Sequence, residues 1–99
     1  MRIPVLVPVL ALAAALLVPA APAAATGQTC RVMDPTDTPL NLRTAPNGRI
    51  VATLPNRLLV QILNIATDAR GRAWAYVRTL DGARRMRGWV YREFIACLN

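Results

Sequence analysis

Residues 39–54 read PLNLRTAPNGRIVATL and contain two strand-like segments on either side of a turn. In the first segment Leu40 and Leu42 alternate with polar residues, and the second, residues 50–54, is mainly β-branched or apolar. Alternation with a period of two is typical of a strand that buries one face. Between the segments, Asn47 and Gly48 are expected to supply the positive-φ positions of a hairpin turn. This part of the chain therefore predicts a β-hairpin.

The rest of the sequence repeats the same pattern of short apolar segments bounded by turn-forming residues. Val60 and Ile62 are predicted core residues of one such segment, with Leu59 and Leu63 on its opposite, partly covered face. Short strands at even spacing are typical of an all-β sandwich or small barrel, and the chain length favours an antiparallel barrel of five to six strands. Strands are expected at residues 29–33, 40–43, 50–54, 58–65, 73–78 and 86–90, followed by one helical turn at 91–94 and a closing strand at 95–98.

The first 25 residues have the features of a secretory signal peptide. Arg2 precedes an apolar run over residues 3–18, and Ala23, Ala24 and Ala25 offer small residues for cleavage close to Thr26. A membrane anchor is the alternative, but the run is shorter than the roughly 20 residues that a spanning helix needs. We therefore expect residues 26–99 to form one exported domain, periplasmic or secreted, with no transmembrane segment after cleavage.

The chain has two cysteines, Cys30 and Cys97, near the two ends of the expected domain. An exported protein meets an oxidising compartment, where an even pair of cysteines usually forms a disulfide. A domain of this size has a marginal hydrophobic core and gains from a covalent link. The sequence therefore predicts a disulfide between Cys30 and Cys97.

The composition argues against catalysis. The chain contains no His, Ser or Lys, which excludes the serine triad, cysteine–histidine nucleophiles, imidazole zinc sites and Schiff-base chemistry. Most of the acidic residues lie in predicted turns, where carboxylates accept hydrogen bonds from backbone amides; the five acids are Asp34, Asp37, Asp68, Asp81 and Glu93. We expect no enzymatic activity, no cofactor and no metal site.

Aromatic residues in the later strands are candidates for binding a ligand. Trp74 and Tyr76 alternate and so share a face opposite Val77, while Tyr91 belongs to a neighbouring segment. Exposed rings along a groove stack on sugars or pack against a peptide. Burial in the core is the competing interpretation, and it is favoured for Trp89, which we expect to be buried or half-buried.

The formal net charge of +7 comes from twelve arginines against five acids and favours an anionic partner. Candidate ligand-binding arginines lie in or beside two loops: Arg70, Arg72, Arg84, Arg85 and Arg87. Loops joining consecutive antiparallel strands lie at opposite ends of a sheet, so two separate patches are expected. Their guanidinium groups suit carboxylates and phosphates, although a merely solvated basic surface is the alternative. Nucleic acid is the least expected partner, because an exported protein leaves the compartment that contains the cell's nucleic acids.

The order of these segments resembles the bacterial SH3-like domain. The resemblance rests on the hairpin beginning at Leu40, on the strand with Trp74, and on Gly88, Trp89 and Val90, and it covers about residues 30–97. Leu42 stands where valine is common in that family, and Thr44, Ala45 and Pro46 stand where serine, glycine and proline are common. The resemblance implies a barrel of five or six strands and a targeting or interaction role, often at the cell wall.

Together these features predict an exported, non-catalytic binding module. The expected ligand is a component of the cell envelope, either peptidoglycan or its peptides. The alternative is a protein-interaction or inhibitor module that binds a peptide or an acidic surface of a partner protein.

Overall fold

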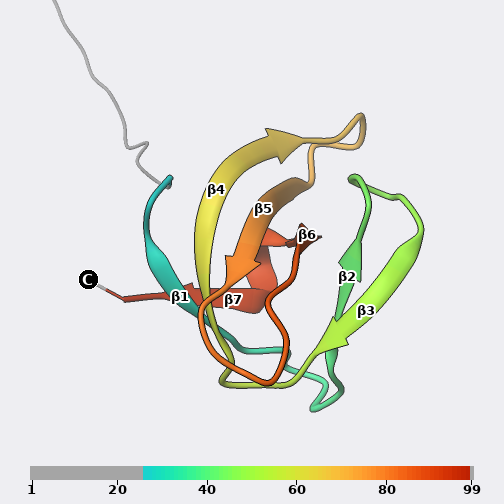
Figure 1. Ribbon diagram of the computed structural model, residues 1–99. Helices are drawn as coiled ribbons and strands as arrows, with labels where there is room; N and C mark the ends of the chain where they lie inside the picture. Colours follow the sequence, from blue (N-terminus) through green and yellow to red (C-terminus); the bar gives the residue numbers. More distant parts are fainter. Residues whose placement is uncertain (1–25, 99) are drawn as a thin grey trace, which may run out of the picture.

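The computed structural model describes residues 26–98, so the predicted signal peptide, residues 1–25, lies outside the described part of the chain. The described part is all-β, as expected, with one short 3-10 turn before the last strand (Figure 1). The strands are β1 (Thr29–Val32), β2 (Leu40–Arg43), β3 (Ile50–Leu54), β4 (Leu59–Thr67), β5 (Ala73–Thr79), β6 (Arg87–Tyr91) and β7 (Ile95–Cys97), and the turn is η3 (Arg92–Phe94).

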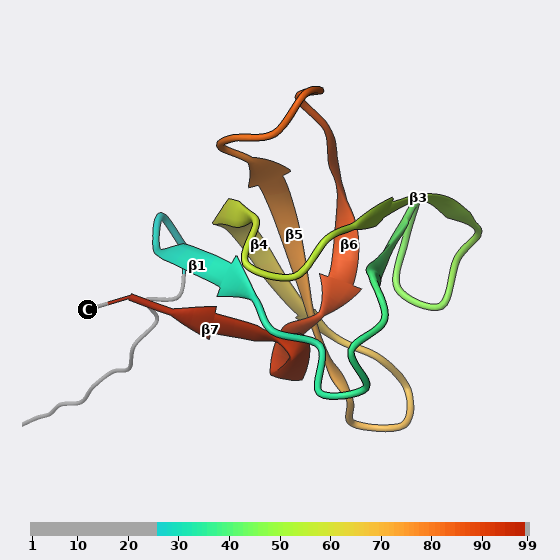
Figure 2. The same ribbon diagram turned by 90° about the horizontal axis from the view of Figure 1, so that it is seen from below.

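All seven strands form one antiparallel sheet with the order β3-β2-β6-β5-β4-β1-β7. Figures 1 and 2 show this sheet curving round, with β2 and β3 on one side of the long β4–β5 pair and β1 and β7 on the other. A register shift between Ile62 and Asn64 interrupts the β4–β5 ladder, as a β-bulge does where a strand bends.

The predicted barrel of five to six strands needs correction in two respects. All seven segments that were expected separately form strands, more than the five to six assigned to the barrel, because both short terminal strands pair, β1 with β4 and β7 with β1. The sheet is also open, since β3 and β7 are its two edges and do not pair with each other. The junction between β2 and β6 is narrow, with a single register pair, Arg43 opposite Trp89.

The inner face of the curved sheet carries the core. Val60 and Ile62 are fully buried, and Leu59 and Leu63 are half-buried on the other face of β4, as predicted. Gly88 lies where β6 passes close to β2, because a Cβ atom at this position would stand 2.6 Å from Cγ of Leu42. The other buried residues of this core are Cys30, Val32, Leu40, Leu42, Leu54, Ala75, Val77, Val90 and Ile95.

The β2–β3 turn differs in detail from the prediction. Asn47 has the expected positive φ of 61°, but Gly48 does not. Gly48 is required for space instead: its amide donates a 2.7 Å hydrogen bond to the carbonyl of Ala45, and a Cβ there would stand 2.9 Å from the Ala45 nitrogen and oxygen. Proline at the second position, Pro46, and a positive φ at the third are the preferences of a type II turn.

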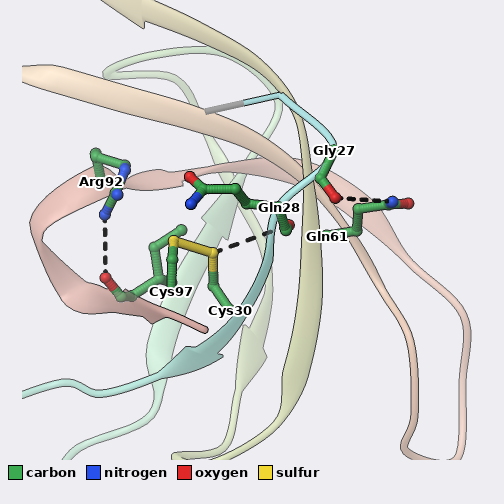
Figure 3. Close-up of a disulfide and its surroundings, with 7 residues drawn as sticks. Gly27, Gln28, Cys30, Gln61, Arg92 and Cys97 are labelled. Atoms are coloured by element: carbon green, nitrogen blue, oxygen red, sulfur yellow. Dashed lines mark hydrogen bonds between the residues drawn. A yellow bond between two sulfur atoms is a disulfide. The ribbon is translucent and has the colours of Figure 1, made fainter. Parts of the chain in front are cut away.

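The predicted disulfide is confirmed. Cys30 on β1 and Cys97 on β7 are register partners and are covalently joined, closing a sequence separation of 67 residues. Figure 3 shows the bond beside Gln28, with Arg92 donating a 3.1 Å hydrogen bond from Nη1 to the carbonyl of Ile95. The disulfide therefore ties the last strand to the first.

Candidate ligand-binding surface

Four aromatic side chains form two cross-strand pairs on the outer face of β5 and β6. Trp74 lies opposite Tyr91, with ring centroids 4.3 Å apart, and Tyr76 lies opposite Trp89, with centroids 5.3 Å apart. Val77 points to the other face and is buried in the core. The predicted division of β5 into an aromatic face and a core face is therefore present.

Trp74 nevertheless cannot serve as an exposed ligand-binding residue, because its side chain is fully buried on this outer face. The ring of Tyr91 packs on it, the guanidinium carbon of Arg43 lies 6.0 Å from its ring, and its indole Nε1 donates a 2.9 Å hydrogen bond to Asp68. The alternation of β5 predicted the correct face, but it could not show that residues from other segments cover this ring.

Asp68 binds four hydrogen-bond donors from three parts of the chain. Oδ2 accepts the indole N–H of Trp74 and the amide of Asn47, at 2.9 and 3.0 Å, and Oδ1 accepts the backbone amides of Arg70 and Arg72, at 2.9 and 3.0 Å. The bond from Trp74, followed by those from Arg72 and Asn47, lowers the pKa of Asp68 well below its usual value. The charged carboxylate thus fastens loop 68–72 to the β2–β3 turn.

The guanidinium group of Arg72 stacks on the ring of Tyr91. The guanidinium carbon of Arg72 lies 3.5 Å from the ring centroid of Tyr91, and the same guanidinium forms an ion pair with Glu93. Phe94 meets the ring of Tyr91 edge-on, with centroids 5.6 Å apart. This stacked arrangement extends the packing around Trp74, so Arg72 and Tyr91 already have partners within the domain.

The second aromatic pair has a different setting. Tyr76 and Trp89 are half-buried, and the next register pair along the same face is Arg78 opposite Arg87, both exposed. Arg78 donates a 2.7 Å hydrogen bond from Nε to Oε1 of Gln61. We call Tyr76, Trp89, Arg78 and Arg87 the aromatic–arginine platform.

The two arginines of the platform, Arg78 and Arg87, are register partners on β5 and β6. Like charges directly opposite each other on neighbouring strands destabilise a sheet. Among residues 26–98 the one ion pair is that of Arg72 and Glu93, so no carboxylate of this part of the chain neutralises Arg78 or Arg87. An anionic ligand would remove this repulsion, while the two rings offer a stacking surface one row away, about 7 Å along the strands.

The other predicted arginines do not join this surface. Arg70 is exposed in loop 68–72 at one end of β5, and Arg84 and Arg85 are exposed in loop 80–86 at its other end. The structure therefore brings Arg87 to Tyr76 and leaves the loop arginines at two separate places. Sequence reasoning missed Arg78 and favoured packing for Trp89, which is half-buried as expected. Alternation places each on one face of its strand, but only the β5–β6 register shows that they adjoin.

Residues 26–98 contain no group of three or more His, Cys, Asp or Glu side chains placed to hold a metal ion. No helix in the same range is long and apolar enough to cross a membrane. Comparisons with known protein families, with curated proteins and with solved structures found no match.

Proposed function

We propose that this protein is an exported, non-catalytic binding module with an SH3-like fold that recognises peptidoglycan or its peptides. One observation carries the proposal: the aromatic–arginine platform puts two adjacent rings beside two arginines that have no ion-pair partner within residues 26–98, all on the outer face of β5 and β6. Its ligand would combine a ring with an anionic group at a spacing of about 7 Å.

Peptidoglycan offers both groups. Sugar rings stack on the faces of Tyr and Trp, as the half-buried rings of Tyr76 and Trp89 permit. The stem peptides carry carboxylates, which the planar guanidinium groups of Arg78 and Arg87 can bind through paired hydrogen bonds. Stacking selects the ring, and the two arginines select the charge beside it.

Different observations support the proposed export and the proposed fold family. The leader-like residues 1–25 and the disulfide between Cys30 and Cys97 both fit a protein that passes into an oxidising compartment. The segments that resemble the SH3-like family form β2, β3, β5 and β6, which are neighbours in the sheet in the order β3-β2-β6-β5, and η3 precedes the last strand.

Co-sedimentation with purified sacculi at about 0.15 M salt tests the proposal, using the oxidised protein in its exported form. We expect the wild type to pellet, and both Tyr76→Ala and the double variant Arg78→Gln, Arg87→Gln to stay in solution. The matched control is Arg84→Gln with Arg85→Gln, which removes the same charge from the loop at the end of β5. Thermal unfolding verifies that each variant is folded.

Two outcomes would overturn the proposal. If the wild type does not pellet, peptidoglycan is not the ligand. If the control variant loses pelleting as much as the platform variants, or a high-salt wash releases the wild type, the binding is non-specific attraction between charges.

A further inference from the structure

A pocket lies at the end of the sheet away from loop 68–72. It is a pocket of about 260 Å³ between turn 55–58, which joins β3 to β4, and loop 80–86, which joins β5 to β6. Both segments are at the bottom of Figure 1. The lining is mainly apolar and consists of Pro55, Leu58, Asp81, Gly82, Ala83, Arg84 and Met86.

Hydrogen bonds hold the loop that walls this pocket. The buried hydroxyl of Thr79 accepts a 2.8 Å bond from the amide of Met86 and donates a 3.3 Å bond to the carbonyl of Arg84. Oδ1 of Asp81 accepts a 3.0 Å bond from the amide of Leu59, the first residue of β4 and the neighbour of Leu58 on the opposite wall. A pocket formed in advance binds with less loss of conformational entropy.

Gly82 allows the loop to lie close to the opposite wall. Its φ is +91°, and a Cβ atom at this position would stand 3.0 Å from Cδ1 of Leu58. Both the backbone conformation and the short contact favour glycine. The close approach of the loop at Gly82 to Leu58 therefore shapes the apolar interior of the pocket.

The surroundings of the pocket are basic. Arg84 lines it, and Nη1 of Arg85 donates a 3.1 Å bond to the carbonyl of Gly82 on its wall. Neither Arg84 nor Arg85 forms an ion pair within residues 26–98, and the one acid of the lining, Asp81, already accepts the Leu59 amide.

We infer that this pocket binds a leucine-type side chain from an acidic, extended segment of a partner protein. Its volume lies just below the roughly 300–1,000 Å³ of sites that enclose whole small-molecule ligands, and its mainly apolar lining favours an aliphatic side chain. The unpaired arginines around it supply charge complementarity for acidic residues flanking that side chain. The site is separate from the aromatic–arginine platform, so the inference goes beyond wall binding.

Peptide binding tests the inference directly. The probe is a fluorescein-labelled peptide of sequence Asp-Glu-Leu-Glu-Asp, titrated into the oxidised protein and followed by anisotropy and by amide chemical shifts. We expect shifts confined to residues 55–59 and 79–86. Replacing the central leucine by alanine should weaken binding at least about fivefold, and replacing the flanking acids by lysines should abolish it.

Variants of the protein identify the site. Ala83 is exposed on the pocket wall, and Ala83→Leu fills the space and should abolish binding, whereas Ala69→Leu in loop 68–72 should not. Arg84→Gln should weaken binding severalfold, and the matched change Arg49→Gln in the β2–β3 turn should have little effect.

Three results would overturn the inference: no binding at about 5 mM peptide, equal affinity for the leucine and alanine peptides, or unchanged binding by Ala83→Leu. Sacculus pelleting of Ala83→Leu should equal that of the wild type. Failure at this pocket is thereby separated from failure of the proposed wall binding.

Discussion

The indole N–H of Trp74 donates a 2.9 Å hydrogen bond to the carboxylate of Asp68, six residues before it in the chain. The same carboxylate oxygen accepts the side-chain amide of Asn47, so one acidic group joins β5, loop 68–72 and the β2–β3 turn. The largest aromatic side chain of β5 is therefore part of the structural framework, and ligand binding on this face is left to Tyr76 and Trp89.

Trp74→Ala should destabilise the protein severely. The side chain is fully buried, and truncating a buried tryptophan costs about 3–5 kcal/mol of unfolding free energy. Trp74→Phe retains most of the packing and loses the hydrogen bond to Asp68, so its loss should be smaller. Urea unfolding measures both values, and a Trp74→Ala variant with wild-type stability would show that the ring is not a framework residue.

Asp68 should make stability depend on acidic pH. Its pKa is lower in the folded protein than in the unfolded chain, where it is about 4, because the folded state donates four hydrogen bonds to the carboxylate. Its stabilising contribution is complete above pH of about 4 and is lost as the pH falls below that. The melting temperature of Asp68→Asn should be lower at neutral pH and should decline less between about pH 5 and pH 2. The same decline of melting temperature with pH in the wild type and the variant would contradict this assignment.

Gly88→Ala should destabilise the contact between β2 and β6. The added Cβ would stand 2.6 Å from Cγ of Leu42 and 2.9 Å from the carbonyl oxygen of Arg43. Overpacking of this kind typically costs about 1–3 kcal/mol. Leu42→Ala removes the first contact but not the second, so the double variant should show a favourable coupling and incomplete rescue in a double-mutant cycle. If the effects of the two substitutions on stability were additive, β2 and β6 would have to move apart freely to make room for the added Cβ atom.

Arg87→Glu should separate stability from binding. It replaces the repulsive pair with Arg78 by an attractive one across the strands, which should stabilise the protein by about 0.2–1 kcal/mol at low salt. The same change should abolish pelleting with sacculi, because it places a negative charge on the platform. Denaturant unfolding and co-sedimentation of one preparation provide both readouts, and intact pelleting would contradict the role of Arg87.

Reduction of the disulfide should lower stability substantially. The bond joins residues 67 apart, and for a loop of that length the chain-entropy relation predicts about 4 kcal/mol. The test compares denaturant unfolding of the oxidised protein with that of the double variant Cys30→Ala, Cys97→Ala. Mass analysis of the oxidised protein should find it two hydrogens lighter than the dithiol, and equal stability of the two forms would contradict a stabilising role.

Local sequence patterns predicted most of the fold. The alternation in residues 40–43 and in β4 assigned the buried faces correctly, since side chains in a strand alternate between two sides whatever its neighbours are. The predicted strand at 73–78 differs by one residue from β5, Ala73–Thr79. The disulfide was predictable because the sequence contains only two cysteines, Cys30 and Cys97.

The candidate site was less predictable. Strand alternation places Tyr76 with Arg78 on one face of β5 and Arg87 with Trp89 on one face of β6, but the platform exists only because the β5–β6 register sets Tyr76 opposite Trp89. Trp74 alternates in the same way as Tyr76, yet it is buried because Asp68, Tyr91 and Arg43 converge on it from three other segments. Such contacts depend on register and loop path, which alternation does not encode.

The sequence by itself therefore determined the all-β class, the positions of the strands, the cysteine pair and the absence of His, Ser and Lys chemistry. Those properties follow from composition and from the two-residue period of a strand. Only the tertiary structure decided that the sheet is open, that Trp74 is a framework residue, and that Arg78 and Arg87 stand side by side. These features arise from pairing between segments distant in the chain, and that pairing is fixed by the packing of the whole domain.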